Sequence, residues 1–168
     1  MHNDPDHDSV WRDYCIQFLG DWYRRADSES RREEIRETLW DAASRDWTIA
    51  GTALISLHRL GNSIDRSRLA KKAYQIASDP ESSSASRTTA LQICATTGYE
   101  KALPLARDIA QSDAEIPLRV SALGAIGILG GSSDVAILKK YEKSAETRLR
   151  YAASAAIERI RRRAGIDD

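Results

Sequence analysis

Residues 117–130 read PLRVSALGAIGILG, and they form the clearest copy of a pattern that recurs along the chain. In this copy an alanine and a leucine lie in the middle and a glycine ends the stretch. Superposition of four such stretches aligns the alanines Ala53, Ala90, Ala122 and Ala153, which are 37, 32 and 31 residues apart. The fourth copy lacks the closing glycine. Repetition at a nearly constant interval of this size is typical of proteins built from stacked structural repeats.

Apolar residues recur at helical spacing almost throughout, and they fall on one helix face in each of nine segments. Short stretches with glycine, proline, asparagine or serine separate these segments. Aromatic residues make up only 7% of the chain while alanine and serine are abundant, which favours helices over strands. The sequence therefore predicts an all-α fold with helices over residues 9–25, 31–45, 47–60, 65–78, 84–97, 100–112, 117–129, 134–144 and 147–163.

The alignment also predicts the core and the helix ends. Mostly apolar residues align four and seven positions after each alanine, namely Leu57, Cys94, Ile126 and Ile157, then Leu60, Thr97, Leu129 and Ile160. Gly61, Gly98 and Gly130 end the first three copies, and we expect a left-handed backbone at each because helices often end in this way at glycine. One such helix cannot bury both of its flanks alone. The repeat therefore predicts a right-handed α-α superhelix of about nine helices.

The stretch 117–130 resembles the second helix of a HEAT repeat, of the short kind found in phycobilisome-lyase-type HEAT proteins. The resemblance is strong for 98–163, fair for 46–97 and weak for 1–45. It implies a HEAT-like solenoid of roughly four helix pairs plus an N-terminal aromatic capping helix. In such repeats an acidic residue often lies six positions before an arginine, which implies an inter-repeat hydrogen-bond ladder. The arginines here are Arg87, Arg119 and Arg150, with Glu81, Asp113 and Ser144 six positions earlier.

The length of 168 residues fits one domain. We expect a disordered acidic tail over 1–8 and a single HEAT-like α-solenoid domain over 9–164, with a divergent cap at 9–45 and repeats at 46–164. The 25 basic and 25 acidic residues balance overall, but residues 1–47 carry 7 basic and 12 acidic groups. The chain is therefore dipolar, with a negative N-terminal end.

The cysteines and the hydropathy of the chain indicate where in the cell the protein is expected. Cys15 and Cys94 are far apart and belong to no paired motif, which argues against a disulfide framework or a zinc ribbon. The longest uncharged stretch, 120–133, has 14 residues, fewer than the ~18 that suggest a membrane span. No secretory signal is visible at the N-terminus. We therefore expect a soluble cytoplasmic protein with free thiols and no membrane partner.

All four tryptophans, at positions 11, 22, 40 and 47, lie near the N-terminus together with Tyr14, Phe18 and Tyr23. An aromatic end helix can present a docking surface, because Trp and Tyr dominate binding hot spots. It can instead cap the open end of the solenoid and fill a thicker core there. We favour the second interpretation and keep the first as the alternative.

The sequence shows no catalytic constellation. Its histidines, His2, His7 and His58, form no metal-binding motif, and no nucleophile elbow or Walker loop occurs. We therefore expect no enzyme activity, no metal and no cofactor. We keep one alternative to this expectation, which is a ligand carrier or a lyase-like enzyme. The lyase is suggested by the resemblance alone.

The C-terminal segment Arg159-Ile160-Arg161-Arg162-Arg163 is rich in positive charge, and nucleic-acid binding is therefore another alternative function. Cations in a last helical turn also complement the helix dipole, and interleaved aromatic residues are missing apart from Tyr151. These two observations disfavour a nucleic-acid partner.

HEAT-like solenoids usually present the second helix of each repeat on the concave face. The positions one before, two after and six after each aligned alanine would then line the groove: Thr52, Ile55, Arg59, Thr89, Gln92, Thr96, Ser121, Gly124, Ile128, Ala152, Ala155 and Arg159. These residues are mostly small and neutral. We therefore expect a non-catalytic protein-interaction module or scaffold, which binds another protein or peptide through this face or through the aromatic N-terminal end. Weak homo-oligomerisation through the open solenoid ends stays open.

Overall fold

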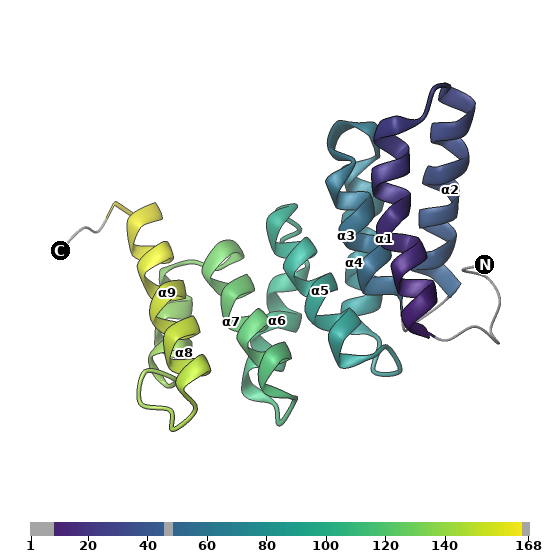
Figure 1. The fold of residues 1–168 in the computed structure, drawn as a ribbon. Coiled ribbons are helices and arrows are strands. Elements are labelled where there is room, and N and C mark those ends of the chain that lie inside the picture. Colours follow the sequence, from purple (N-terminus) through teal and green to yellow (C-terminus); the bar gives the residue numbers. More distant parts are fainter. Residues whose placement is uncertain (1–8, 46–48, 166–168) are drawn as a thin grey trace. The chain divides into compact units, whose positions relative to one another are not determined.

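A computed structural model describes residues 9–45 and 49–165, which form α-helices, two short 3-10 helices and no strand (Figure 1). The predicted all-α fold is confirmed. The α-helices in these ranges are α1 (Ser9–Arg25), α2 (Glu29–Arg45), α3 (Ala50–Arg59), α4 (Arg66–Ser78), α5 (Ser84–Thr96), α6 (Ala102–Gln111), α7 (Ile116–Leu129), α8 (Val135–Lys139) and α9 (Thr147–Arg163). The 3-10 helices are η1 (Gly61–Ser63) and η2 (Ser132–Asp134). The acidic tail expected over 1–8 and Trp47 lie outside the described residues.

The predicted segments match the observed helices closely except at α8. The sequence predicts a helix over 134–144, whereas α8 ends at Lys139 and turns follow it. Leu138 is the last fully buried residue of this segment. The next five residues, 139–143, contain three lysines and a glutamate, so a longer helix would bury little more apolar surface.

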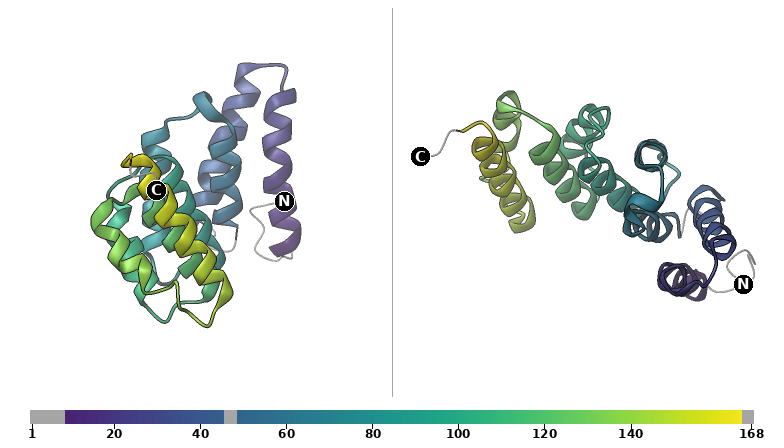
Figure 2. Two further views of the ribbon diagram at one scale, coloured as in Figure 1. Left: turned by 90° about the vertical axis from the view of Figure 1, so that its left-hand side faces the viewer. Right: turned by 90° about the horizontal axis from the view of Figure 1, so that it is seen from above.

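The helices group into two compact units, Met1–Ile93 and Cys94–Asp168, and the boundary falls inside α5. In the first unit α1 packs against α2 and α3, and α3 packs against α4 (Figure 1). In the second unit α6 packs on α7, α7 on α9 and α8 on α9, so the green and yellow helices lie side by side (Figure 2). The single domain predicted over 9–164 stays a prediction.

The aligned alanines and the residues four positions after them form the core, as the repeat predicts, whereas Leu60, Thr97 and Leu129, seven positions after the alanines, are only half-buried. The four aligned alanines Ala53, Ala90, Ala122 and Ala153 are all 0% exposed. The leucines that follow the first three alanines are also fully buried. Ser154, which replaces leucine in the fourth copy, is exposed. Since alanine adds little bulk, a buried alanine at each aligned position lets the helix backbones approach closely.

In the second unit, α7 lies very close to α9 at Gly127. A Cβ atom built on Gly127 would lie 2.7 Å from the Cα atom of Ala156, a distance that real side chains do not adopt. Gly124, three residues earlier on the same helix, has no neighbouring atom within 4 Å of such a Cβ position. Gly127 is therefore required by packing, and Gly124 is not.

Only two of the three closing glycines adopt the expected backbone. Gly61 and Gly98 have φ values of 60° and 74°, so the left-handed conformation is confirmed there. Gly130 has a φ of −78°, and the prediction is wrong at this position. A Cβ atom on Gly130 would lie 2.6 Å from a carboxylate oxygen of Asp134. Glycine is needed there because a buried carboxylate lies against the backbone.

Asp134 is the one charged residue that is buried in the core of the described chain, at 1% exposure. Its two carboxylate oxygens accept hydrogen bonds from Arg107 on α6, Oδ1 from Nε at 2.7 Å and Oδ2 from Nη2 at 3.1 Å. The backbone N–H of Gly131 donates to Oδ2 at 2.9 Å. Burial by itself would raise the pKa of Asp134, but these hydrogen bonds outweigh it and the pKa lies below its ordinary value. The bidentate pair ties η2 to α6.

The substitution Gly127→Ala tests the close packing of α7 on α9. We expect the free energy of unfolding to fall by about 1–3 kcal/mol, because the added methyl group overlaps Ala156. Gly124→Ala is the matched control and should instead stabilise the helix by about 0.5–1 kcal/mol. Urea denaturation followed by circular dichroism measures both. Equal effects of the two substitutions would contradict the close approach.

The substitution Asp134→Asn tests the buried ion pair. Because the pKa of Asp134 is lowered by folding, its stabilising contribution is present at neutral pH and is lost as the pH falls below about 4. We expect Asp134→Asn to cost about 3 kcal/mol at pH 7, since Arg107 loses its charged partner, and less at pH 3. The exposed Asp108→Asn is the control. A cost that is the same at both pH values would show that the carboxylate charge does not stabilise the fold.

Candidate functional site

Helix α1 packs on its neighbours α2 and α3 through one of its faces. Ile16 on this face is 0% exposed. Asp13 accepts a hydrogen bond from the hydroxyl group of Thr52 on α3. One turn further along α3, Ser56 Oγ donates to the carbonyl oxygen of Ile16 at 3.4 Å. Near the other end of α1, the hydroxyl oxygen of Tyr23 accepts a hydrogen bond from Arg36 Nη1 on α2 at 2.9 Å. The inner face is thus held at both ends by polar contacts.

The opposite face of α1 carries five large apolar side chains that solvent reaches. Their exposed fractions are 56% for Val10, 68% for Trp11, 50% for Tyr14, 54% for Phe18 and 56% for Trp22. We call these five residues the aromatic face. Their spacing places them along one side of the helix. The rings of Trp11 and Tyr14 meet edge to face, with centroids 6.4 Å apart.

The favoured interpretation of the N-terminal aromatic residues, that they fill a thicker core, is wrong for this face. Of the three tryptophans in the described residues, only Trp40 on α2 is buried, at 6% exposure. Helix α1 has apolar side chains on two sides, and the side with Ile16 also carries the groups that bond to α2 and α3. Hydrogen bonding therefore selects the inner face and leaves the larger aromatic side chains outside.

The residues expected on a concave face are divided between the two units. Thr52 is half-buried and donates its hydroxyl hydrogen to Asp13 on α1, and Ser121 is only 5% exposed. Ile55, Arg59 and Gln92 in the first unit and Arg159 in the second are exposed, while Thr89 and Ile128 are half-buried. The structure brings no more than part of this set together in either unit.

The three arginines of the expected ladder bind backbone carbonyl groups. The bonds run from Arg87 Nε to Ala77 O at 3.1 Å, from Arg119 Nε to Ala110 O at 3.3 Å, and from Arg150 Nη1 to Ser144 O at 2.5 Å. Ala77 and Ala110 lie in the last turns of α4 and α6, where carbonyl groups lack helical partners. Arg87 and Arg119 therefore cap the preceding helix and do not bond to Glu81 and Asp113. Arg150 does bond to the residue six positions earlier, Ser144, but through its backbone carbonyl group.

A tyrosine supplies a link between neighbouring helix pairs in the second unit. The hydroxyl group of Tyr141, which follows α8, donates to the carbonyl oxygen of Ala110 at 2.6 Å. The Arg119 guanidinium lies 5.8 Å from the centre of the Tyr141 ring. One carbonyl group at the end of α6 thus accepts from both neighbours. No feature of the sequence points to this acceptor, because every residue carries the same carbonyl group.

The arginine-rich end of α9 is partly used within the fold. Arg163 Nη1 donates to the carbonyl oxygens of Ile128 at 2.6 Å and Gly127 at 3.3 Å, and Nη2 donates to that of Gly130. Arg163 therefore caps the C-terminal end of α7. Arg159 and Arg162 remain exposed.

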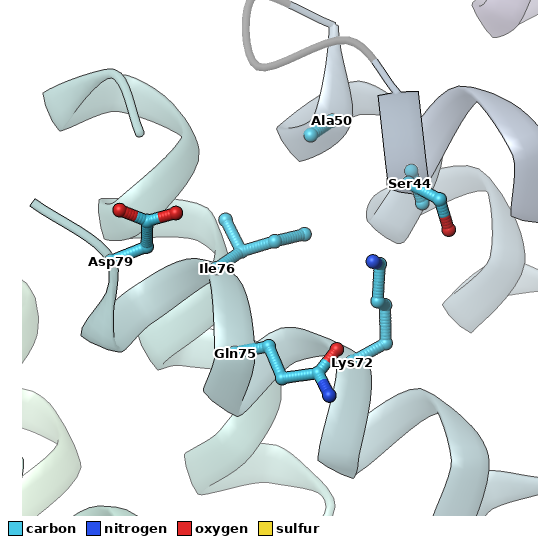
Figure 3. A pocket seen from close by; sticks show the side chains of 7 residues that line it. Ser44, Ala50, Lys72, Gln75, Ile76 and Asp79 are labelled. Atoms are coloured by element: carbon cyan, nitrogen blue, oxygen red, sulfur yellow. The ribbon is translucent and has the colours of Figure 1, made fainter. Parts of the chain in front are cut away.

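A groove in the first unit lies between α2 and α4. One hollow of about 150 Å³ is lined by Ala43, Ser44, Ala50, Lys72, Gln75, Ile76 and Asp79 (Figure 3). A shallower hollow of about 350 Å³ shares Ser44, Lys72 and Gln75 and adds Trp40, Asp65, Arg68 and Lys71. Lys72 points from α4 toward the end of α2, and burial lowers its pKa (Figure 3). The first hollow is smaller than the ~300 Å³ at which ligand pockets usually begin.

The cysteine and histidine side chains of the described residues form no catalytic or metal-binding cluster. Cys94 is fully buried, and burial raises the pKa of its thiol to about 12, so it is not a reactive nucleophile. His58 is exposed, whereas His2 and His7 lie outside the described residues. Within residues 9–45 and 49–165, no three His, Cys, Asp or Glu side chains are placed to hold a metal ion. None of the helices described is long and apolar enough to span a bilayer.

Comparison with known proteins does not identify a family. No protein-family model matches the chain, and no curated protein is significantly similar to it.

Paired tryptophan substitutions test which aromatic side chains lie outside. Trp22→Ala should cost no more than about 2 kcal/mol, because more than half of the side chain is exposed and only the remainder lies in a hollow that it lines with Ile35. Trp40→Ala should cost about 3–5 kcal/mol, because it leaves a cavity between helices. Urea denaturation of both variants measures the difference. A large loss for Trp22→Ala would place the aromatic face inside the fold.

Proposed function

We propose that this chain is a non-catalytic protein-interaction module built from HEAT-like helical repeats, and that a partner docks on the aromatic face of α1. The observation that carries this proposal is the exposure of five large apolar side chains along one helix. The expected alternatives rest on weaker features, because Arg163 is used as a helix cap, and the α2–α4 groove consists of one hollow of about 150 Å³ and one shallower hollow of about 350 Å³.

The size of the aromatic face supports a binding role. An aromatic side chain offers about 150–250 Å² when fully exposed, so the four aromatic side chains and the smaller Val10, each half exposed or more, present roughly 500 Å². The largest apolar patch on a typical monomer covers about 300–600 Å² and is often functional. Tryptophan and tyrosine are also the residues that contribute most to binding energy when they are covered.

The shape of the face favours a helical partner. The face runs along one side of a helix from Val10 to Trp22, a length of about 18 Å. Side chains at intervals of three and four residues form ridges, and a second amphipathic helix packs its own ridges into the grooves between them. Polar residues border the face, since Gln17 is exposed and Asp21 is half exposed. They supply the rim that specific interfaces require.

The concave face supports the proposal less well. Helix α1 covers Thr52, and Ser121 is buried, so two of the expected contact residues are already used by the fold. Ile55 is 37% exposed and is the one large apolar side chain of that set among the exposed hydrophobic residues. We also propose a cytoplasmic location, as expected from the sequence; Cys15 and Cys94 form no disulfide bond with each other.

Site-specific photo-crosslinking tests the proposal. The photoreactive residue p-benzoylphenylalanine replaces Phe18 on the aromatic face or, as the matched control, Tyr151 on α9, which is 74% exposed. After irradiation in the cells that naturally make the protein, we expect a protein adduct at position 18 and not at 151. Trp22→Glu in the same chain should abolish that adduct. An absent adduct at 18, or the same adduct at both positions, would overturn the proposal.

A further inference from the structure

We propose that the helix which covers the aromatic face is α1 of a second copy of this chain, packed antiparallel about a two-fold axis. The inference rests on the docking role assigned to α1 above and names the partner. A two-fold interface requires one surface that complements itself, because the same residues face each other from both copies. The aromatic face meets this requirement in its distribution of apolar side chains and in the charges at its two ends.

The apolar side chains are distributed nearly symmetrically along the helix. Trp11 lies toward one end and Trp22 toward the other, with Tyr14 and Phe18 between them. An antiparallel partner therefore places Trp11 of one copy near Trp22 of the other, while the two Phe18 side chains lie near the middle. Each tryptophan then contacts an aromatic or aliphatic surface instead of water. The two shorter aromatic side chains fill the space between them.

The charges at the two ends favour the antiparallel orientation. The sequence directly before α1 carries three aspartates, Asp4, Asp6 and Asp8. The last turn of α1 carries Arg24, which is paired with Asp21, and Arg25, and both arginines are exposed, so this end keeps a net positive charge. Along the sequence the negative charge precedes α1 and the positive charge ends it, so an antiparallel order of the two copies pairs opposite charges and a parallel order pairs like charges. The helix dipoles also oppose each other in the antiparallel arrangement.

The area predicts how strong the association is. Roughly 500 Å² of apolar surface from each copy gives a total of about 1,000 Å². Stable specific interfaces bury about 1,200–2,000 Å², and smaller ones belong to weak or transient complexes. The dimer is therefore concentration-dependent and dissociates on dilution.

Sedimentation equilibrium across a concentration series tests the pairing. We expect the wild-type chain to shift from monomer to dimer as concentration rises. Phe18→Glu should weaken association about tenfold or more, because it buries a charge at the centre of the interface. Tyr151→Glu, which changes an exposed aromatic residue on α9, should leave association unchanged. Circular dichroism confirms that both variants fold. A monomer at every concentration, or equal effects of the two substitutions, would overturn the proposal.

Crosslinking tests the orientation. Val10→Cys and Arg25→Cys are made separately in a Cys15→Ser background, and buried Cys94 is left in place because its thiol does not react. With a short bis-maleimide, a mixture of the two variants should give a crosslinked dimer, and each variant alone should give much less. A variant that crosslinks to itself as readily as the mixture does would overturn the antiparallel arrangement.

The crosslinking at position 18 separates failure of this inference from failure of the docking role. A self-adduct of twice the chain mass supports the dimer. An adduct with a different polypeptide, together with a monomer in sedimentation, shows that the docking role stands and that self-pairing is wrong. No adduct at position 18 overturns both.

Discussion

Close contact between helix backbones at small residues is the constraint on which the rest of the structure depends. Each of the four repeat copies buries an alanine completely, and in the second unit the approach of α7 to α9 leaves no room for a Cβ atom at Gly127. Backbones that lie this close determine which side of each helix faces inward. Larger apolar residues such as Leu54 and Ile126 then fill the space around the contact. Whatever lies on the outer side of each helix is left for solvent or for a partner.

The repeat made the helices and the core predictable. Four aligned copies show which residues share a face, because one buried position in a copy implies the same position in the others. Helix α1 has no copy with which to align, and it carries apolar side chains on two sides. The choice between those sides depends on hydrogen bonds with Thr52, Ser56 and Arg36 on neighbouring helices. Contacts of that kind connect residues far apart in the chain, and hydrophobic periodicity contains no information about them.

The features that the sequence did not predict share a physical cause, which is bonding to or near the backbone. Arg87 and Arg119 are recognisable as repeated positions, but their acceptors are carbonyl groups, which every residue has. Gly130 is recognisable as a helix end, yet its role follows from the Asp134 carboxylate and the bidentate contact of that carboxylate with Arg107. The arginine bonds join consecutive helices, α5 to α4 and α7 to α6, and the contact of Arg107 with Asp134 joins α6 to η2. They also leave the aromatic face of α1 outside the network that holds the fold together, so its side chains serve neither capping nor core packing and are open to a binding role.

Fluorine NMR of the chain labelled with 5-fluorotryptophan tests pairing through α1 most directly, because exposed and buried tryptophans report separately within one sample. Trp11 and Trp22 lie on the aromatic face, whereas Trp40 is buried in the first unit. If two copies pair through α1, the resonances of Trp11 and Trp22 shift on dilution while that of Trp40 does not move. Resonances of Trp11 and Trp22 that stay unchanged from micromolar to millimolar concentration would contradict the account.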